Sequence, residues 1–144
     1  MQINPYLAFD GDGAAAFAFY ERVFGGKAQC MTFAQMPPDD GPGRDALPAG
    51  WADKIMHGQL AVGQGMMMGS DGMPGQTRQA SRGVALAVSA DSSAEAERIF
   101  AALSEGGKVT MPMAETFWAH RFGALTDKFG FDWLVNHLKT SPTG

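Results

Sequence analysis

The chain carries the same order of elements twice, and this internal repeat limits the folds that it can adopt. The first copy, residues 3–27, reads as an apolar strand, a helix and the stop sequence Gly-Gly-Lys. The second copy, residues 83–108, repeats strand, helix and Gly-Gly-Lys in the same order. A repeated unit of this size predicts two similar modules rather than one irregular chain.

The two predicted helices have matching apolar faces. In each, four apolar residues recur at positions i, i+3, i+4 and i+7, the spacing of one face of a helix. The second set follows the first 80 positions later: Ala16, Phe19, Tyr20 and Val23, then Ala96, Ile99, Phe100 and Leu103. We expect each helix to pack this face against its own sheet.

Both helices also have recognisable ends. Asp12 stands where the side chain of an N-cap residue would accept a backbone hydrogen bond, and Ser92 with Glu95 forms the S-x-x-E capping-box pattern. The Gly-Gly pairs that follow the helices suit the left-handed backbone of a helix C-terminus. These signals predict helices over residues 14–24 and 94–105.

The remaining periodic segments alternate as strands do. In the first module these are 27–36, 54–62 and 65–69. In the second they are 109–118, 120–126 and 131–137. Each module is therefore predicted as β-α-β-β-β, and the chain as an α+β protein.

The modules are expected to span about residues 1–70 and 82–138 of a single domain, 1–144. Two polar stretches lie outside the pattern. Residues 36–53 are rich in proline and acids, and are long enough to form a lid or a dimer contact. Residues 69–83 are predicted to link the modules.

Composition excludes several classes of function. A net charge of −4 without a basic stripe argues against a nucleic-acid partner. The single cysteine, Cys30, cannot form an intramolecular disulfide or a cysteine-built zinc site, and we expect it to be an inert buried thiol. Residues 1–12 do not read as a signal peptide, and no apolar run has the length of a membrane helix. We expect a cytoplasmic protein that does not bind membranes.

Several segments resemble one known superfamily: "NPYLAFDG", "AFAFYERVFGG", "KIMHGQLAVG" and "TFWAHRFGALTDKFGFDWLVN". Over residues 3–137 the chain is similar to the PhnB-like branch of the vicinal oxygen chelate superfamily, which includes glyoxalase I, bleomycin resistance proteins and ring-cleaving dioxygenases. The resemblance implies two curved mixed sheets around a cavity, each with a helix on its outer face, and a homodimer. A methyltransferase name sometimes given to this branch finds no support, because the chain lacks the parallel doubly wound sheet of a usual methyl-donor site.

Metal-dependent relatives bind a divalent ion through four strand positions. Three of the four matching positions here lack a strong ligand. The resemblance therefore implies no bound metal and no other cofactor, although a shifted register could bring in His120, Asp132 or Asn136. The matching positions are Asn4 or Pro5, His57, Gly83 or Ala85, and Leu134.

His57 is the central candidate for chemistry. In the strand 54–63, His57 and Gln59 share one face, and Met56, Leu60 and Val62 share the other. If the helix covers the apolar face, His57 and Gln59 point into the cavity. There His57 could donate a hydrogen bond to a ligand or serve as a general base. The alternative is a histidine that only organises the core.

The remaining candidates are aromatic or basic. Phe117 and Trp118 could form the wall of a pocket for a flat ligand, and Arg121 could pair with an anionic group. The alternative places both aromatic rings in the module core and leaves His120 and Arg121 in solvent. Tyr6, on the opening strand, joins Phe117, Trp118 and Arg121 among the expected ligand-binding residues.

Two further patterns bear on function. Met66, Met67 and Met68 are apolar on both faces of their strand, which is typical of a core or an interface. No nucleophile elbow, phosphate loop or zinc-protease motif is present. We therefore expect a small-molecule-binding protein without a metal. The alternative is an isomerase, lyase or dioxygenase that uses a metal or His57, and the sequence leaves open whether any reaction is catalysed.

Overall fold

The structure, a computed structural model, describes residues 1–37, 47–73, 75, 78–79 and 82–140. The chain divides into two compact units, Met1–Gln79 and Ala80–Gly144. The boundary falls inside the predicted linker, residues 69–83. Half of the predicted lid or dimer loop, residues 38–46 of 36–53, lies outside the described residues.

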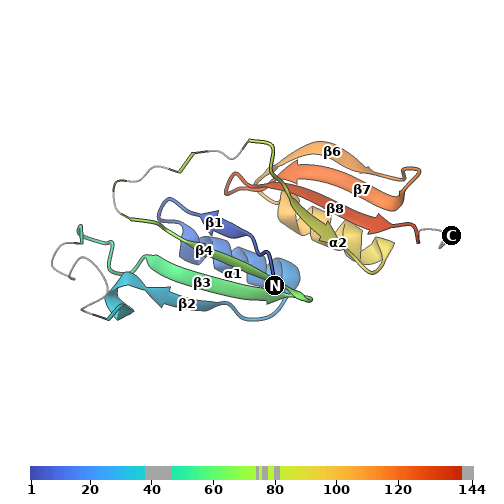
Figure 1. The fold of residues 1–144 in the computed structure, drawn as a ribbon. Coiled ribbons are helices and arrows are strands. Elements are labelled where there is room, and N and C mark those ends of the chain that lie inside the picture. Colours follow the sequence, from blue (N-terminus) through green and yellow to red (C-terminus); the bar gives the residue numbers. More distant parts are fainter. Residues whose placement is uncertain (38–46, 74, 76–77, 80–81, 141–144) are drawn as a thin grey trace. The chain divides into compact units, whose positions relative to one another are not determined.

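Unit 1 forms a four-stranded mixed sheet with one helix (Figure 1). The strands lie in the order β1-β4-β3-β2, here called sheet A. Strands β1 and β4 are parallel, and the other neighbours are antiparallel. The elements are β1 (Tyr6–Ala8), α1 (Gly13–Phe24), β2 (Gln29–Thr32), the short 3-10 helix η1 (Phe33–Gln35), β3 (Ile55–Val62) and β4 (Gly65–Ser70).

Unit 2 repeats this architecture as sheet B, with strand order β5-β8-β7-β6 and a parallel β5–β8 pair. Its elements are β5 (Leu86–Ser89), α2 (Ser93–Ser104), β6 (Lys108–Ala114), β7 (Ala119–Thr126) and β8 (Asp132–Leu138). The shared strand order confirms the predicted duplication and the α+β class.

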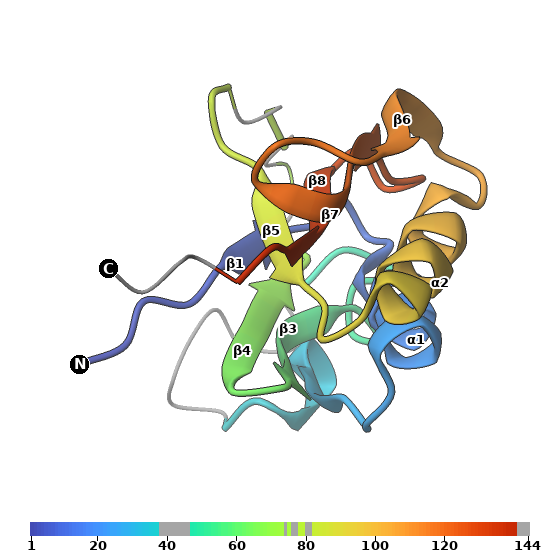
Figure 2. The same cartoon turned by 90° about the vertical axis from the view of Figure 1, so that its right-hand side faces the viewer.

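Each helix lies against its own sheet, as Figures 1 and 2 show, and its predicted apolar face is buried. Of the four predicted residues of each helix, none is more than 9% exposed. A glycine in the facing strand makes room for the helix in both units. A Cβ on Gly58 would lie 2.4 Å from Phe17 Cε2, and one on Gly123 would lie 2.7 Å from Phe100 Cε2. These two glycines mark the helix-covered face of each sheet.

Asp12 is the N-cap residue of α1 as predicted, but its side chain does not cap the helix, whereas the Ser92 side chain caps α2. The Asp12 side chain makes no cap hydrogen bond; its Oδ1 lies 3.2 Å from the Asp10 backbone nitrogen. Asp71, just beyond β4, takes its place and accepts from the Gly13 backbone at 2.9 Å. In α2, the Ser92 hydroxyl accepts from the Glu95 backbone at 3.1 Å as predicted. A distant carboxylate thus replaces the local cap in unit 1.

Two predicted strands end early for local reasons. The segment 27–36 is a strand only over β2, because Thr32 starts the 3-10 turn and its backbone N–H donates to Gln35 Oε1 at 2.9 Å. The segment 109–118 ends at Ala114, because Thr116 and Ala119 form a tight turn through reciprocal bonds of 3.0 Å. The opening strand is also shorter than predicted, with three residues in β1.

Cys30 corrects a further expectation, because its side chain is exposed and not buried. Partial desolvation of the sulfur and the neighbouring Glu21 carboxylate raise the pKa of the thiol. The raised pKa favours the protonated form, so the thiol is a poor nucleophile despite its exposure. As for membranes, neither helix in the described part of the chain is long and apolar enough to span one.

Candidate functional site

Side chains of Tyr6, His57, Gln59, Met66 and Met68 share the face of sheet A that lies opposite α1, here called the open face of sheet A. The orientation follows from Gly58, which faces the helix, because successive side chains of a strand point to opposite sides. The strand register aligns Tyr6 and Gln59 with Met68 between them. The fold therefore brings the three unit 1 candidates, Tyr6, His57 and Gln59, onto one surface.

His57 is held by Tyr6. The Tyr6 hydroxyl lies 3.2 Å from His57 Nδ1, and the two ring centroids are 5.8 Å apart. When the hydroxyl donates to Nδ1, the other ring nitrogen, Nε2, carries the proton and acts as a donor. When Nδ1 donates to the hydroxyl, Nε2 presents a lone pair and can accept a hydrogen bond or a proton. The contact with Tyr6 thus orients the His57 ring and leaves Nε2 as the ring nitrogen that can bind a ligand or transfer a proton.

Gln59 belongs to a second polar pair on the same face. Its Nε2 donates to Gln29 Oε1 at 3.0 Å, and the two residues are direct partners in the β2–β3 register. Met31 is the register partner of His57 and is 42% exposed. Neither Gln29 nor Met31 stands out in the sequence, because the segment 27–36 has no pattern that separates one face of the strand from the other.

The methionine run divides between core and face. Met67 is 5% exposed and belongs to the core, whereas Met66 and Met68 are half-buried on the open face. Methionine is flexible and polarizable, so it can adapt to ligands of different shapes. The open face thus combines an adaptable apolar surface with fixed polar groups.

In unit 2 the aromatic candidates lie at the surface. Phe117 is 89% exposed and Trp118 is 42% exposed, so the alternative that places both in the module core is wrong. Their ring centroids are 4.8 Å apart, and Trp118 also contacts Phe122 at 5.4 Å. The structure therefore groups Phe117 and Trp118, and it adds Phe122, which the sequence analysis left unassigned.

Arg121 points towards α2. Its Nε lies 2.8 Å from Glu97 Oε1, in an ion pair of partly exposed side chains. His120 is exposed, with its ring centroid 4.8 Å from that of His137, and His137 Nδ1 lies 3.0 Å from the Ser93 hydroxyl. The pairing with Glu97 turns the guanidinium away from Trp118. An anionic ligand of Arg121 would therefore have to compete with Glu97.

The donor set does not fit the superfamily metal. Within the ranges that the structure describes, no three His, Cys, Asp or Glu side chains are grouped to hold a metal ion. Asn4 and Pro5 precede β1, and Leu134 lies in register with Ala87 and Ala124. His57 is the one strong ligand among the four matching positions. A single imidazole does not hold a divalent ion against water.

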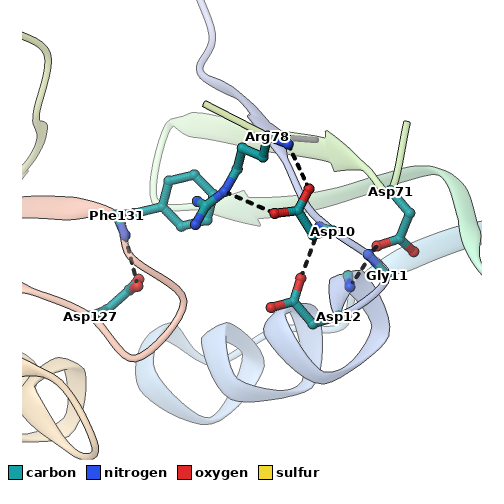
Figure 3. A network of polar contacts seen from close by, with 8 residues as sticks. Asp10, Gly11, Asp12, Asp71, Arg78, Asp127 and Phe131 are labelled. Carbon is teal, nitrogen blue, oxygen red and sulfur yellow. Dashed lines mark hydrogen bonds and ion pairs between the residues drawn. The ribbon is translucent and has the colours of Figure 1, made fainter. Parts of the chain in front are cut away.

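The pocket beside Asp71 lies where hydrogen bonds connect the end of β4 to α1 and β3, which indicates a structural role. It has a volume of about 240 Å³, and its lining includes Asp10, Asp71 and Arg78. Asp10 accepts from the Arg78 backbone at 2.8 Å (Figure 3). The 2%-exposed Asp71 carboxylate accepts from three backbone N–H groups at 2.7–2.9 Å. Those three donors belong to Gly11, Gly13 and Ile55, so the Asp71 carboxylate holds the end of β4 to α1 and β3.

Comparisons with known proteins agree with this architecture. Residues 2–135 match the Glyoxalase/Bleomycin resistance protein/Dioxygenase superfamily. Protein YjdN of Escherichia coli (strain K12) is 35% identical over 147 residues, covering 99% of both chains.

Solved structures show the same fold. Protein PA1353 from Pseudomonas aeruginosa has a TM-score of 0.79 at 44% identity, covering 95% of this chain and 97% of the other. The PhnB protein from Bacillus cereus has a TM-score of 0.71 at 21% identity, covering 95% of this chain and 99% of the other, so it shares the fold of the predicted PhnB-like branch. With the superfamily match over nearly all of its length, this chain belongs to the glyoxalase/bleomycin resistance protein/dioxygenase superfamily.

Proposed function

We propose that the protein binds a small organic ligand on the open face of sheet A, through His57 and without a metal ion. The observation that carries this proposal is the 3.2 Å contact between the Tyr6 hydroxyl and His57 Nδ1, on the face that α1 does not cover. Fixing a side chain before the ligand arrives reduces the entropy lost on binding. Tyr6 would thus prepare His57 Nε2 to meet the ligand.

The surroundings of His57 support a ligand with an apolar body and one polar group. Tyr6 is 52% exposed, and Met31, Met66 and Met68 provide polarizable surface around the imidazole. The polar group would be a carbonyl, which accepts from Nε2–H, or a hydroxyl, which can accept from Nε2–H or donate to the Nε2 lone pair of the other tautomer. Gln59 would add a second hydrogen bond, at the cost of its bond to Gln29.

Substitution of His57 by glutamine tests this proposal. We expect the free energy of unfolding to fall by less than about 1 kcal/mol, because a polar side chain of similar reach remains on an open face. Ligand affinity should fall about five-fold, since a matched hydrogen bond contributes roughly 1 kcal/mol. Urea unfolding measures the first effect. Calorimetric titration, with a compound that co-purifies or emerges from a screen, measures the second.

The matched control for His57→Gln is Ala61→Gln. Ala61 is an exposed residue of β3 on the same face. The Ala61→Gln substitution should leave the free energy of unfolding and the ligand affinity nearly unchanged. Strong destabilisation by His57→Gln with unaltered affinity would instead show that His57 organises the core.

The same site supports a second candidate, an enzyme in which His57 is a general base. The Tyr6 hydroxyl favours this candidate, because its oxygen can accept a hydrogen bond from His57 Nδ1–H. In that tautomer Nε2 has a lone pair and can take up a proton. The two candidates differ in turnover. If a bound compound is recovered chemically changed by the wild type and unchanged by His57→Gln, the protein is an enzyme.

Metal content provides an independent check. We expect less than one-tenth of an equivalent of Zn, Ni, Mn or Fe after extensive dialysis, because one imidazole is a weak site. Elemental analysis of freshly purified protein measures this. About one tightly held equivalent would contradict the proposal and favour a metal-dependent reaction, which chelation should then abolish.

We also propose that the protein is a homodimer, as its superfamily resemblance implies. The exposed Val109 and Met111 of β6 are apolar surface that a second copy could cover without covering His57. Sedimentation at micromolar concentration should give twice the chain mass of 15.3 kDa. A single species of one chain mass would contradict the proposal.

A further inference from the structure

Asn136 in β8 has an unusual environment. The side chain is 9% exposed, yet its Oδ1 is buried and has no hydrogen-bond partner among the described residues. An unsatisfied buried carbonyl oxygen is costly, and native structures contain few of them. The absence of a donor from the described residues therefore requires an explanation.

The strand register places Asn136 on the face of sheet B opposite α2. Gly123 faces α2, and its register partner is Val135. The next residue of β8, Asn136, therefore points to the other face, where it lies between Ser89 and Phe122. His57 and Phe122 each precede the glycine that faces the helix, so the two residues occupy corresponding positions in the two modules.

Aromatic rings adjoin this amide. Phe122 is the direct partner of Asn136, and Trp118 packs against Phe122 in an edge-to-face contact at 5.4 Å. Beyond them, Phe117 is 89% exposed and Leu138 is 49% exposed. This surface offers edges and faces of aromatic rings to a flat molecule, next to an acceptor that lacks a donor.

We propose that Asn136, Phe122 and Trp118 form a binding site for a planar aromatic ligand that carries a hydrogen-bond donor, N–H or O–H. The ring of the ligand packs on Trp118 and Phe122, and its donor satisfies Asn136 Oδ1. This site stands on unit 2 alone and does not depend on the proposed role of His57. It explains both the missing partner of Asn136 and the exposure of two neighbouring aromatic residues.

The test compares two probes that differ only in the donor: indole, which has an N–H, and 1-methylindole, which lacks it. Binding to the full chain is followed by NMR, through the side-chain amide signals of Asn136 and the indole N–H signal of Trp118. We expect indole to shift both signals and to bind about two- to ten-fold more tightly than 1-methylindole, the effect of one net hydrogen bond.

Two variants assign the effect to particular residues. Asn136→Leu should remove the preference for indole while still binding 1-methylindole, because the leucine has similar size and no acceptor. Trp118→Ala should weaken both probes by a similar factor. Heat-unfolding curves of Asn136→Leu verify that it folds. Should it not, Asn136→Ala, which also lacks an acceptor, is the second variant and should likewise remove the preference for indole.

Three results would overturn the proposal: equal affinity of the two probes, retention of the preference in Asn136→Leu, or binding that leaves the Trp118 and Asn136 signals unmoved. None of these results tests the His57 site, because that site is tested by the effect of His57→Gln on the affinity for its own ligand. Failure here and failure of the proposed function are therefore distinguishable.

Discussion

Asp71→Ala is expected to lower the free energy of unfolding by about 3–5 kcal/mol. The Asp71 carboxylate accepts from the backbone of Gly11 and Gly13 through Oδ1, and from that of Ile55 through Oδ2. Its removal leaves three donors without a partner, those of Gly13 and Ile55 in buried bonds and that of Gly11 in a part-buried one. Each unpaired donor costs about 1–3 kcal/mol, minus whatever an entering water restores. Urea unfolding followed by far-UV circular dichroism measures the loss.

The matched control for Asp71→Ala is Asp12→Ala. Asp12 is the residue that the sequence predicts as the helix cap, yet among the described residues its side chain accepts from the Asp10 backbone at the surface and not from the helix. We expect a loss below about 0.5 kcal/mol, as for other surface substitutions. Asp71→Asn should be intermediate, since the amide keeps one acceptor oxygen. Similar losses for Asp71→Ala and Asp12→Ala would show that the predicted local cap was correct after all.

Gly58→Ala is the second substitution with a large expected effect, a loss of about 3 kcal/mol. The added methyl group would lie 2.4 Å from Phe17 Cε2, well inside van der Waals contact, and Phe17 is 2% exposed and cannot move freely. Overpacking of a filled core typically costs about 1–3 kcal/mol, and this contact is at the severe end. Chemical unfolding of the variant measures the effect.

Two comparisons make the Gly58 result specific. Gly65→Ala places a methyl group on the neighbouring strand with its nearest atom, the Val62 carbonyl oxygen, at 3.4 Å, so it should change stability by less than about 1 kcal/mol. Phe17→Leu should recover part of the loss in the double variant with Gly58→Ala, because the two sites touch. Equal effects of Gly58→Ala and Gly65→Ala would mean that Gly58 does not face α1. That result would also remove the basis for placing His57 on the open face.

Local patterns predicted the elements of the fold well. The helix stripes, the Gly-Gly stops and the Ser92 cap depend on residues a few positions apart, and the structure confirms them. The N-cap position of Asp12 was predicted correctly but the capping side chain was not, because Asp71 is distant in sequence and reaches α1 only once β4 has paired with β1. Local propensity contains no information about that contact.

The candidate site shows the same limit. Alternation correctly separated His57 and Gln59 from Leu60, because it is a property of a single strand. The Tyr6 partner of His57 depends on the pairing of β1, β4 and β3, which no single strand encodes. Asn136 was considered only as a remote metal ligand, since a missing hydrogen-bond partner becomes visible only when all of its neighbours are known.

The methionines offer the most direct test of the open face as the ligand site. With ¹³C-labelled methyl groups, Met66 and Met68 report on the open face, while Met67 between them reports on the core. On titration of a bound compound, we predict shifts of the Met66 and Met68 signals and an unmoved Met67 signal, with the shifts weakened in His57→Gln. Saturable binding that leaves Met66 and Met68 unmoved would contradict the account.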